Sequence, residues 1–175
     1  MTKKIAVVGA TGRMGKLALD LIEASQDLSV FAALDSSNEL SEAAGADAIF
    51  DVTRLEVSER VVEYAVANSI PVVVGTSGWT AAKLSAIEVA SSSVVVIPNF
   101  SVGSMLATRF AAEAAKFFDS IEIIEAHHAG KVDSPSGTAI RTAELIAKSR
   151  DNAPLVPGVG QQARGEIVAG VPIHS

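Results

Sequence analysis

Short runs of β-branched and other apolar residues recur along the first hundred residues, each ended by a glycine, a proline or a polar residue. We expect these runs to be strands, over residues 5–8, 28–34, 48–52, 70–74 and 94–97. Most of the segments between them repeat apolar positions every three or four residues, which is typical of amphipathic helices. The helices are expected over 14–22, 57–65 and 80–90. Strands that alternate with helices predict an α/β fold with a parallel sheet and right-handed crossovers.

The pattern changes after about residue 101. Ser101 is placed to cap a longer helix, a strand is expected over 121–124, and a further helix over 138–148. Residues 151–165 are rich in proline, glycine and glutamine and predict a loop. A last strand is expected over 168–173. The chain is therefore divided into a first part, 1–101, and a second part, 102–175.

Composition and charge narrow the class of protein. Of 175 residues, 49% are hydrophobic and 19% charged, enough apolar material for a packed core. Fourteen basic against twenty acidic residues give a net charge of −6, which disfavours nucleic acid and anionic membranes as partners. The absence of cysteine excludes a disulfide scaffold, a thiolate-bound metal and a cysteine nucleophile. No apolar run has the length of a membrane span or a signal peptide, so we expect a soluble cytoplasmic protein.

A glycine-rich segment joins the first predicted strand to the first helix. Its sequence, Gly9-Ala10-Thr11-Gly12-Arg13-Met14-Gly15, has the spacing Gly-x-x-Gly-x-x-Gly. Gly9 permits a tight turn, Gly12 lets the backbone approach a pyrophosphate, and Gly15 lets the helix pack closely on the strand. The helix start supplies N–H groups and a positive dipole end for the anion. The segment predicts a dinucleotide site.

An acid at the end of the second predicted strand bears on the choice of cofactor. Asp35 follows Gly15 by about 20 residues, where a carboxylate can bind the adenosine ribose hydroxyls. It disfavours a 2′-phosphate, and Ser36 and Ser37 offer no cation, although Arg13 and Lys16 are near enough in sequence to pair with phosphate. We therefore expect NADH, with NADPH as the alternative. A glycine-rich turn beside a solvated aspartate is the alternative interpretation.

A second cluster, over residues 125–139, holds two of the three histidines. Ser136-Gly137-Thr138 places hydroxyl and N–H groups at a helix start, and Lys131 adds a cation, so the cluster predicts an anion site. A histidine titrates near neutral pH and can donate a proton to a reduced substrate. We expect a small anionic substrate of the carboxylate class. The alternatives are a metal site, disfavoured by the lack of cysteine and of a nearby carboxylate set, a pair of surface histidines, and Ser136 as a helix cap alone.

Four segments together resemble the family of 4-hydroxy-tetrahydrodipicolinate reductases, also called dihydrodipicolinate reductases, of bacterial lysine and diaminopimelate biosynthesis. They are Val8–Gly15, Val74–Trp79, Pro98–Gly103 and Glu125–Ala139. The last matches the family signature Glu-x-His-His-x-x-Lys-x-Asp-x-Pro-Ser-Gly-Thr-Ala. The resemblance implies a Rossmann-like nucleotide domain and NAD(P)H-dependent reduction of 4-hydroxy-tetrahydrodipicolinate to tetrahydrodipicolinate.

The resemblance also implies a role for each matching residue. His127 is expected to be the general acid/base, with Lys131 as its charged partner. The substrate is a small dicarboxylate, and its carboxylates would be bound by His128, Lys131, Ser136, Gly137 and Thr138. The adenosine diphosphate half of the cofactor would be held by Gly9, Thr11, Gly12, Arg13, Met14 and Asp35. The nicotinamide would be placed by Gly75, Thr76, Ser77, Gly78, Asn99 and Phe100. No metal is expected.

By the same resemblance, residues 1–101 are the dinucleotide-binding domain and 102–175 are part of an α+β domain for substrate binding and tetramerisation. Family members run some tens of residues further, so a homotetramer is expected for full-length members but not for this chain. The last strand is expected to lack sheet neighbours, so the chain should bind NADH with little reductase activity.

Two other functions remain open from the sequence. One is reduction of another small carboxylate imine. The other is a non-catalytic NAD(P)-binding or redox-sensing module, which would leave the His-His-x-x-Lys and Ser-Gly-Thr cluster unexplained. Semialdehyde dehydrogenases share the nucleotide loop but need the cysteine nucleophile that this chain lacks.

Overall fold

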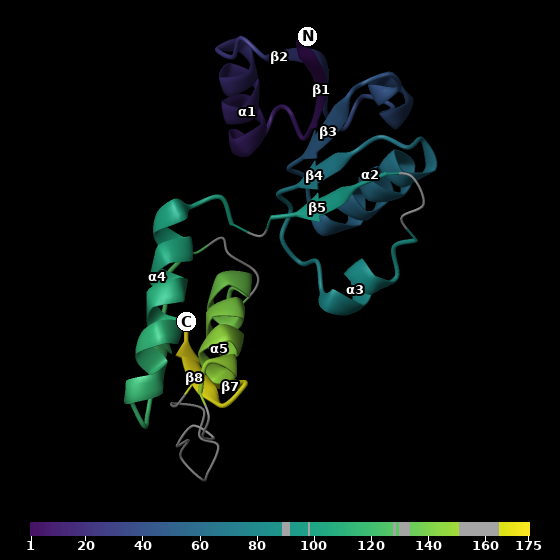
Figure 1. Ribbon diagram of the computed structural model, residues 1–175. Helices are drawn as coiled ribbons and strands as arrows, with labels where there is room; N and C mark the ends of the chain where they lie inside the picture. Colours follow the sequence, from purple (N-terminus) through teal and green to yellow (C-terminus); the bar gives the residue numbers. More distant parts are fainter. Residues whose placement is uncertain (89–91, 98, 128, 130–133, 151–164) are drawn as a thin grey trace. The chain divides into compact units, whose positions relative to one another are not determined.

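The computed structural model describes residues 1–88, 92–97, 99–127, 129, 134–150 and 165–175 (Figure 1). The chain divides into two compact units, Met1–Phe100 and Ser101–Ser175. Within the described residues, no helix is long and apolar enough to span a membrane.

The N-terminal unit is a five-stranded sheet in the order β2-β1-β3-β4-β5, and every neighbouring pair is parallel. Its strands are β1 (Lys3–Val8), β2 (Leu28–Leu34), β3 (Ala48–Asp51), β4 (Val72–Val74) and β5 (Val94–Val96). Its helices are α1 (Arg13–Glu23), α2 (Leu55–Ala67), the short α3 (Ala81–Ser85) and the 3₁₀ turn η1 (Leu40–Ala43). The predicted Rossmann-like parallel sheet is confirmed.

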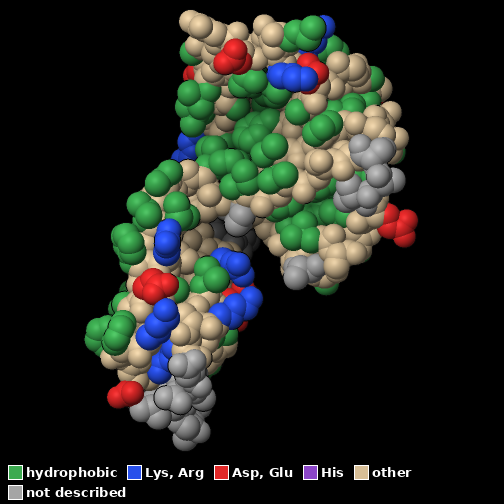
Figure 2. All heavy atoms as spheres, viewed as in Figure 1, with side chains coloured by type: hydrophobic (Ala, Val, Ile, Leu, Met, Phe, Trp, Pro, Cys, Tyr) green, Lys and Arg blue, Asp and Glu red, His purple; other side chains and the backbone are tan. Residues whose placement is uncertain are grey.

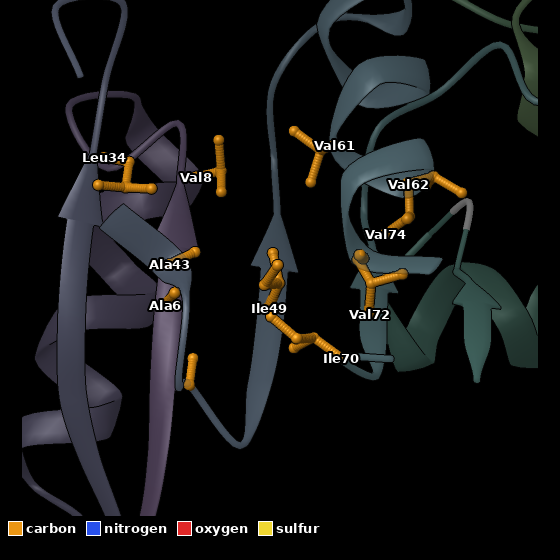
Figure 3. Packing of buried hydrophobic residues seen from close by; sticks show 12 residues of the cluster. Ala6, Val8, Leu34, Ala43, Ile49, Val61, Val62, Ile70, Val72 and Val74 are labelled. Carbon is orange, nitrogen blue, oxygen red and sulfur yellow. The ribbon is translucent and has the colours of Figure 1, made fainter. Parts of the chain in front are cut away.

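Alternate residues of β1 pack on opposite faces of this sheet. Ala6 and Val8 belong to a core that joins the strands to α2 and that also includes Ile49 and Val61 (Figure 3). Val7 belongs to the other core, which joins the sheet to α1. Because helices cover both faces, the strands read as nearly continuous apolar runs, which is why the sequence pattern revealed them.

The strand order places a topological switch beside β1. The chain passes from β1 through α1 to β2 on one side, and β3 then pairs with the other side of β1. Open α/β sheets bind ligands outside the carboxyl ends of the strands at such a switch. The segments that follow β1 and β3 therefore lie where a ligand is expected.

The predicted helix over 80–90 is wrong in length. Thr80 caps it as expected, accepting from the Lys83 amide at 3.3 Å, but α3 ends at Ser85. The β-branched Ile87 instead packs against the core of the sheet. Ile87 is half-buried there, a tertiary contact of the kind that can outweigh helix propensity.

The C-terminal unit is a three-stranded sheet packed with two helices. Its elements are α4 (Val102–Ala114), the 3₁₀ turn η2 (Ala115–Phe117), β6 (Ile123–Ile124), α5 (Gly137–Lys148), β7 (Glu166–Val168) and β8 (Val171–His174). Ser101 caps α4 as expected, accepting from the Ser104 amide at 3.2 Å. The Thr108 and Thr142 hydroxyls, 2.9 Å apart, join α4 to α5. The loop predicted over 151–165 lies, up to residue 164, outside the described residues.

The single unpaired strand expected over 168–173 is wrong in two respects. Ala169 and Gly170 both have positive φ, 50° and 80°, so a two-residue turn splits the segment into the hairpin of β7 and β8. β8 is also the central strand, parallel to β6 and antiparallel to β7. Val171 and Ile173 are buried in the core of this unit. The strand therefore finds its neighbours within the chain.

Apolar side chains remain exposed along α4 and the turn after it (Figure 2). Val102, Phe110 and Phe117 are 66%, 64% and 83% exposed, and the described residues of α4 include none that is buried. The helix therefore contributes less to the core of this unit than α5, which buries Ala143 and Ile146.

The close packing of α1 on the first turn can be tested with Gly15→Ala. A Cβ atom at residue 15 would lie 2.1 Å from the Gly9 carbonyl oxygen and 2.7 Å from the Ala10 Cα. We expect the free energy of unfolding of the N-terminal unit to fall by about 3 kcal/mol, because backbone cannot yield as a side chain does. Urea unfolding followed by the fluorescence of Trp79, the single tryptophan, measures it.

The matched control is Lys16→Ala, at the next and exposed position of α1. It should change the free energy of unfolding by less than about 0.5 kcal/mol. Equal effects of the two substitutions would contradict the packing argument.

Candidate cofactor and substrate sites

The turn after β1 is held by backbone contacts that leave no room for side chains. The amides of Gly9 and Ala10 both donate to the Leu34 carbonyl, at 2.9 and 3.0 Å. Gly9 has a φ of 90°, and a Cβ atom there would lie 2.7 Å from the Val52 carbonyl oxygen. The turn is thus fixed between the ends of β2 and β3, next to the start of α1.

The start of α1 is open to an anion. Gly12 occupies the N-cap position in an extended conformation, and in the described structure no side chain caps the helix. Its first N–H groups therefore retain the capacity to bind a pyrophosphate. Thr11, Arg13 and Met14 are exposed around this helix start.

Asp35 lies directly after Leu34, the residue that accepts both amides of the glycine turn. Its Oδ1 accepts from the Ser37 hydroxyl at 2.7 Å and from the Ser37 amide at 2.8 Å. The bond from the Ser37 hydroxyl has the larger effect, and together the two bonds lower the pKa of Asp35 from its ordinary value. The ionised carboxylate is therefore oriented beside the turn as an acceptor for hydroxyl groups.

The segment after β4 lies against the segments that follow β3 and β5. The Gly75 amide donates to the Asp51 carbonyl at 2.7 Å. A Cβ atom at Gly75 would lie 2.6 Å from the Phe100 ring, which makes an edge contact with Phe50 at a centroid distance of 5.9 Å. Gly78 has a φ of 94°, and Ser77 beside it is exposed. The structure thus brings Gly75 and Phe100 together, as a shared site requires.

Two of the predicted cofactor residues in this region are less exposed. Asn99 is half-buried, and Thr76 is only 4% exposed. The Thr76 hydroxyl accepts from the Thr53 amide at 2.9 Å and donates to Asp51 at 3.0 Å. That side chain is therefore engaged inside the protein, and a ligand would meet the Thr76 backbone.

Asp51 was not identified from the sequence as a functional residue. It ends β3 and is completely buried, and its carboxylate accepts hydrogen bonds from Thr53, Ser58 and Thr76. The available signal was an acid at the end of an otherwise apolar run, a position where a charge has to be compensated.

In the C-terminal unit, Glu125 joins several of the candidate substrate residues. Its carboxylate accepts from the Ser136 amide at 2.7 Å, from the Ser136 hydroxyl and from the Ser175 hydroxyl at 2.7 Å. His127 Nε2 lies 3.8 Å from Glu125 Oε2. The Glu125 amide donates to the His174 carbonyl at 2.9 Å, which fixes this residue to the end of β8.

Burial raises the pKa of the Glu125 carboxyl, but the bonds from Ser136 and Ser175 and the nearby His127 outweigh it, so the pKa is lowered overall. Glu125 therefore remains an ionised acceptor. Glu125 is part of the family signature, but its role could not be predicted from the sequence, because a contact to a residue eleven positions away leaves no periodic signal.

The start of α5 combines a cap with an open position. Ser136 is buried and accepts from the Ala139 amide at 3.1 Å, which confirms that it caps the helix. Gly137 and Thr138 are exposed, and among the described residues nothing lies within 4 Å of a Cβ atom built at Gly137. His128 and Lys131 lie outside the described residues.

The described residues contain no group of three or more histidine, cysteine, aspartate or glutamate side chains that could hold an ion.

Both units of the chain match models of a known protein family. Residues 3–100 match the family model described as dihydrodipicolinate reductase, N-terminus, and residues 103–175 match the model of the C-terminus. Sheet order and glycine turn define a dinucleotide-binding α/β fold. With both halves matched, the chain belongs to the dihydrodipicolinate reductase family.

Individual relatives agree with this assignment. The 4-hydroxy-tetrahydrodipicolinate reductase of Clavibacter sepedonicus is 54% identical over 100% of this chain and 66% of its own length. That of Mycolicibacterium smegmatis is 38% identical over 98% of this chain and 75% of its own. The chain thus spans just under two thirds of the length of the Clavibacter relative.

Solved structures show the same fold. A dipicolinate-bound dihydrodipicolinate reductase from Paenisporosarcina sp. TG-14 is 28% identical, with a TM-score of 0.67 over 99% of this chain and 78% of that chain. An aspartate semialdehyde dehydrogenase from Vibrio cholerae is 12% identical, with a TM-score of 0.51 over 99% of this chain and 66% of that one. The second likeness concerns the fold alone.

The role of the Glu125 carboxylate can be tested with Glu125→Gln. We expect the free energy of unfolding of the C-terminal unit to fall by about 2 kcal/mol at pH 7, because charged hydrogen bonds to Ser136 are lost. A carboxyl whose pKa is lower in the folded state stabilises the fold above its unfolded pKa, about 4.3, and loses this effect as pH falls through the folded value. The difference should therefore shrink in acid, as measured by circular dichroism during thermal unfolding at pH 7 and below pH ~3.

Glu113→Gln is the control in the same unit. The pKa of Glu113 is also lowered, by the side chain of Lys116, but this pair lies on the exposed surface and is screened by water. Its loss should cost much less than that of Glu125. A difference between Glu125→Gln and the parent that is the same at both pH values would contradict the assignment.

Proposed function

We propose that the protein reduces 4-hydroxy-tetrahydrodipicolinate to tetrahydrodipicolinate with NADH or NADPH, as a step of lysine and diaminopimelate biosynthesis. The observation that carries this proposal is the family match over both units, together with the complete signature over residues 125–139. Reduction of the conjugated imine formed by loss of water needs a hydride, a proton and a site for two carboxylates. When bound, the nicotinamide supplies the hydride.

The N-terminal unit, with residues 1–101 as its proposed extent, binds the cofactor. The adenosine diphosphate half is held by Gly9, Thr11, Gly12, Arg13, Met14 and Asp35. The open helix start and the close turn support this assignment. The nicotinamide half is placed by Gly75, Thr76, Ser77, Gly78, Asn99 and Phe100, with Thr76 acting through its backbone. The contact between Gly75 and Phe100 supports a joint role for these segments.

Residues 102–175 contribute substrate binding and assembly. His127 acts as the general acid that protonates the reduced ring, with Lys131 as its charged partner. The substrate carboxylates are bound by His128, Lys131, Ser136, Gly137 and Thr138. Both donors of Ser136 are already bonded to Glu125, so we assign most of the binding at the start of α5 to Gly137 and Thr138. A homotetramer is proposed for a protein of the relatives' full length.

Asp35 favours NADH over NADPH because its carboxylate accepts from ribose hydroxyls and repels a 2′-phosphate. We expect Asp35→Ser to lower the ratio of kcat/KM for NADH to that for NADPH about tenfold, the equivalent of one charged hydrogen bond. Initial rates with each cofactor at saturating substrate measure this ratio.

Asp27→Ser, at the opposite end of β2, is the matched control and should leave the ratio unchanged. An unchanged ratio in Asp35→Ser would show that Asp35 plays no part in cofactor choice and would direct attention to Arg13 and Lys16.

The reductase activity is tested by loss of nicotinamide absorbance after addition of freshly prepared substrate, with the Clavibacter sepedonicus relative as positive control. Lys131→Ala should lower turnover about 100-fold, because a charged partner is lost in a closed site. Binding of NADH, measured by calorimetry, should not change.

Lys148→Ala, an exposed substitution in the last turn of α5, should keep parental turnover.

Binding of NADH without turnover by the parent, beside an active relative, would instead favour the non-catalytic module. An unpaired last strand would predict little reductase activity for residues 1–175, but β8 is paired on both sides. The same assay on residues 1–175 measures that activity.

A further inference from the structure

A carboxylate without solvent contact sits at the carboxyl edge of the sheet. Asp51 ends β3, the central strand, and is 0% exposed. Burial of a charged group is costly unless hydrogen bonds replace its hydration. A buried position at the end of a strand is usually occupied by an apolar residue. The groups that donate hydrogen bonds to Asp51 therefore indicate which parts of the structure this carboxylate holds in place.

Among the described residues, both carboxylate oxygens of Asp51 accept hydrogen bonds from neutral donors. Oδ1 accepts from the Thr53 hydroxyl at 2.6 Å and from the Thr53 amide at 3.2 Å. Oδ2 accepts from the Thr76 hydroxyl at 3.0 Å and from the Ser58 hydroxyl. A carboxylate has about four acceptor positions, so these four donors match its capacity.

The donors extend the network to both ends of the segment after β4. Trp79 Nε1 donates to the Ser58 hydroxyl at 3.0 Å, and the Thr53 amide also donates to the Thr76 hydroxyl at 2.9 Å. Residue 76 is thus tied to the carboxylate directly and residue 79 through Ser58. Between these two anchors lie Ser77 and Gly78, which are exposed. Linked hydrogen bonds of this kind strengthen one another in a buried environment.

We infer that Asp51 is a positioning residue for the nicotinamide half of the cofactor site. It holds Thr76 and Trp79, and thereby fixes the exposed backbone of Ser77 and Gly78 that lies between them. Being buried, it acts only through these neighbours. The inference rests on the proposed function, since it assumes that this segment meets the nicotinamide.

The test compares two ligands on the same protein. ADP-ribose contains the adenosine diphosphate half of NADH but lacks the nicotinamide. Asp51→Asn keeps the shape of the side chain but loses the charge and part of its acceptor capacity. We expect the Kd for NADH to rise about tenfold, the equivalent of one charged hydrogen bond, while the Kd for ADP-ribose changes less than about twofold. Calorimetry measures both.

Asp47→Asn is the matched control, because Asp47 precedes the same strand at its other end and bonds Lys3 and Lys4 on the surface. It should change neither Kd. A merely structural role of Asp51 would weaken both ligands together, and that result would overturn the inference.

Trp79→Phe is the second variant and keeps the inference testable if Asp51→Asn does not fold. It removes the donor to Ser58 but retains a ring that can pack on the core. We expect the Kd for NADH to rise about threefold, the equivalent of one neutral hydrogen bond, with ADP-ribose unaffected. Unchanged NADH binding in this variant would overturn the inference. Failure of the parent to bind either ligand would instead refute the proposed function, and the inference with it.

Discussion

The N-terminal unit depends on one steric constraint: the glycine turn after β1 packs so closely on α1 and on the end of β3 that it leaves no room for side chains at residues 9 and 15. A Cβ atom at residue 15 would lie 2.1 Å from the Gly9 carbonyl oxygen, and one at residue 9 would lie 2.7 Å from the Val52 carbonyl oxygen. Backbone therefore packs on backbone from β1 to α1 and from β1 to the end of β3. Since parallel strands end at one edge, the segment after β4 lies at the same edge as the segments after β1 and β3, beside the switch of the sheet.

The two units use the same device to hold their functional segments. In the first, the Asp51 carboxylate binds donors from Thr53, Ser58 and Thr76. In the second, Glu125 binds both donors of Ser136 and lies near His127. In each case an acid near the proposed binding residues accepts hydrogen bonds from its own segment or from another segment of the chain, and at least one hydroxyl donor lies eleven or more positions away. Burial of each acid costs solvation free energy, and the hydrogen bonds that offset this cost also hold the neighbouring segments in place. The offset requires that nearly all acceptor positions of the carboxylate have donors.

Much of the fold could be predicted from the sequence because the strands of a covered sheet are apolar on both faces. The errors arose where tertiary contacts decide. The helix after Thr80 ends before Ile87, which packs half-buried against the core, and the positive φ of Ala169 turns an expected strand into a hairpin. Glycines and the family signature identified the candidate residues, but the partners of Asp51 and Glu125 lie up to 25 and 50 positions away and leave no pattern in the sequence.

The central claim is that the carboxyl edge of the parallel sheet binds a nicotinamide dinucleotide. A titration of the ¹⁵N-labelled protein with NADH, followed by amide chemical shifts, tests it most directly. We expect the largest shifts on residues 9–15, on Asp35 and on residues 75–79, and we expect ADP-ribose to reproduce only the first two groups. Shifts spread over the amino ends of the strands, or the absence of any shift at saturating NADH, would contradict it.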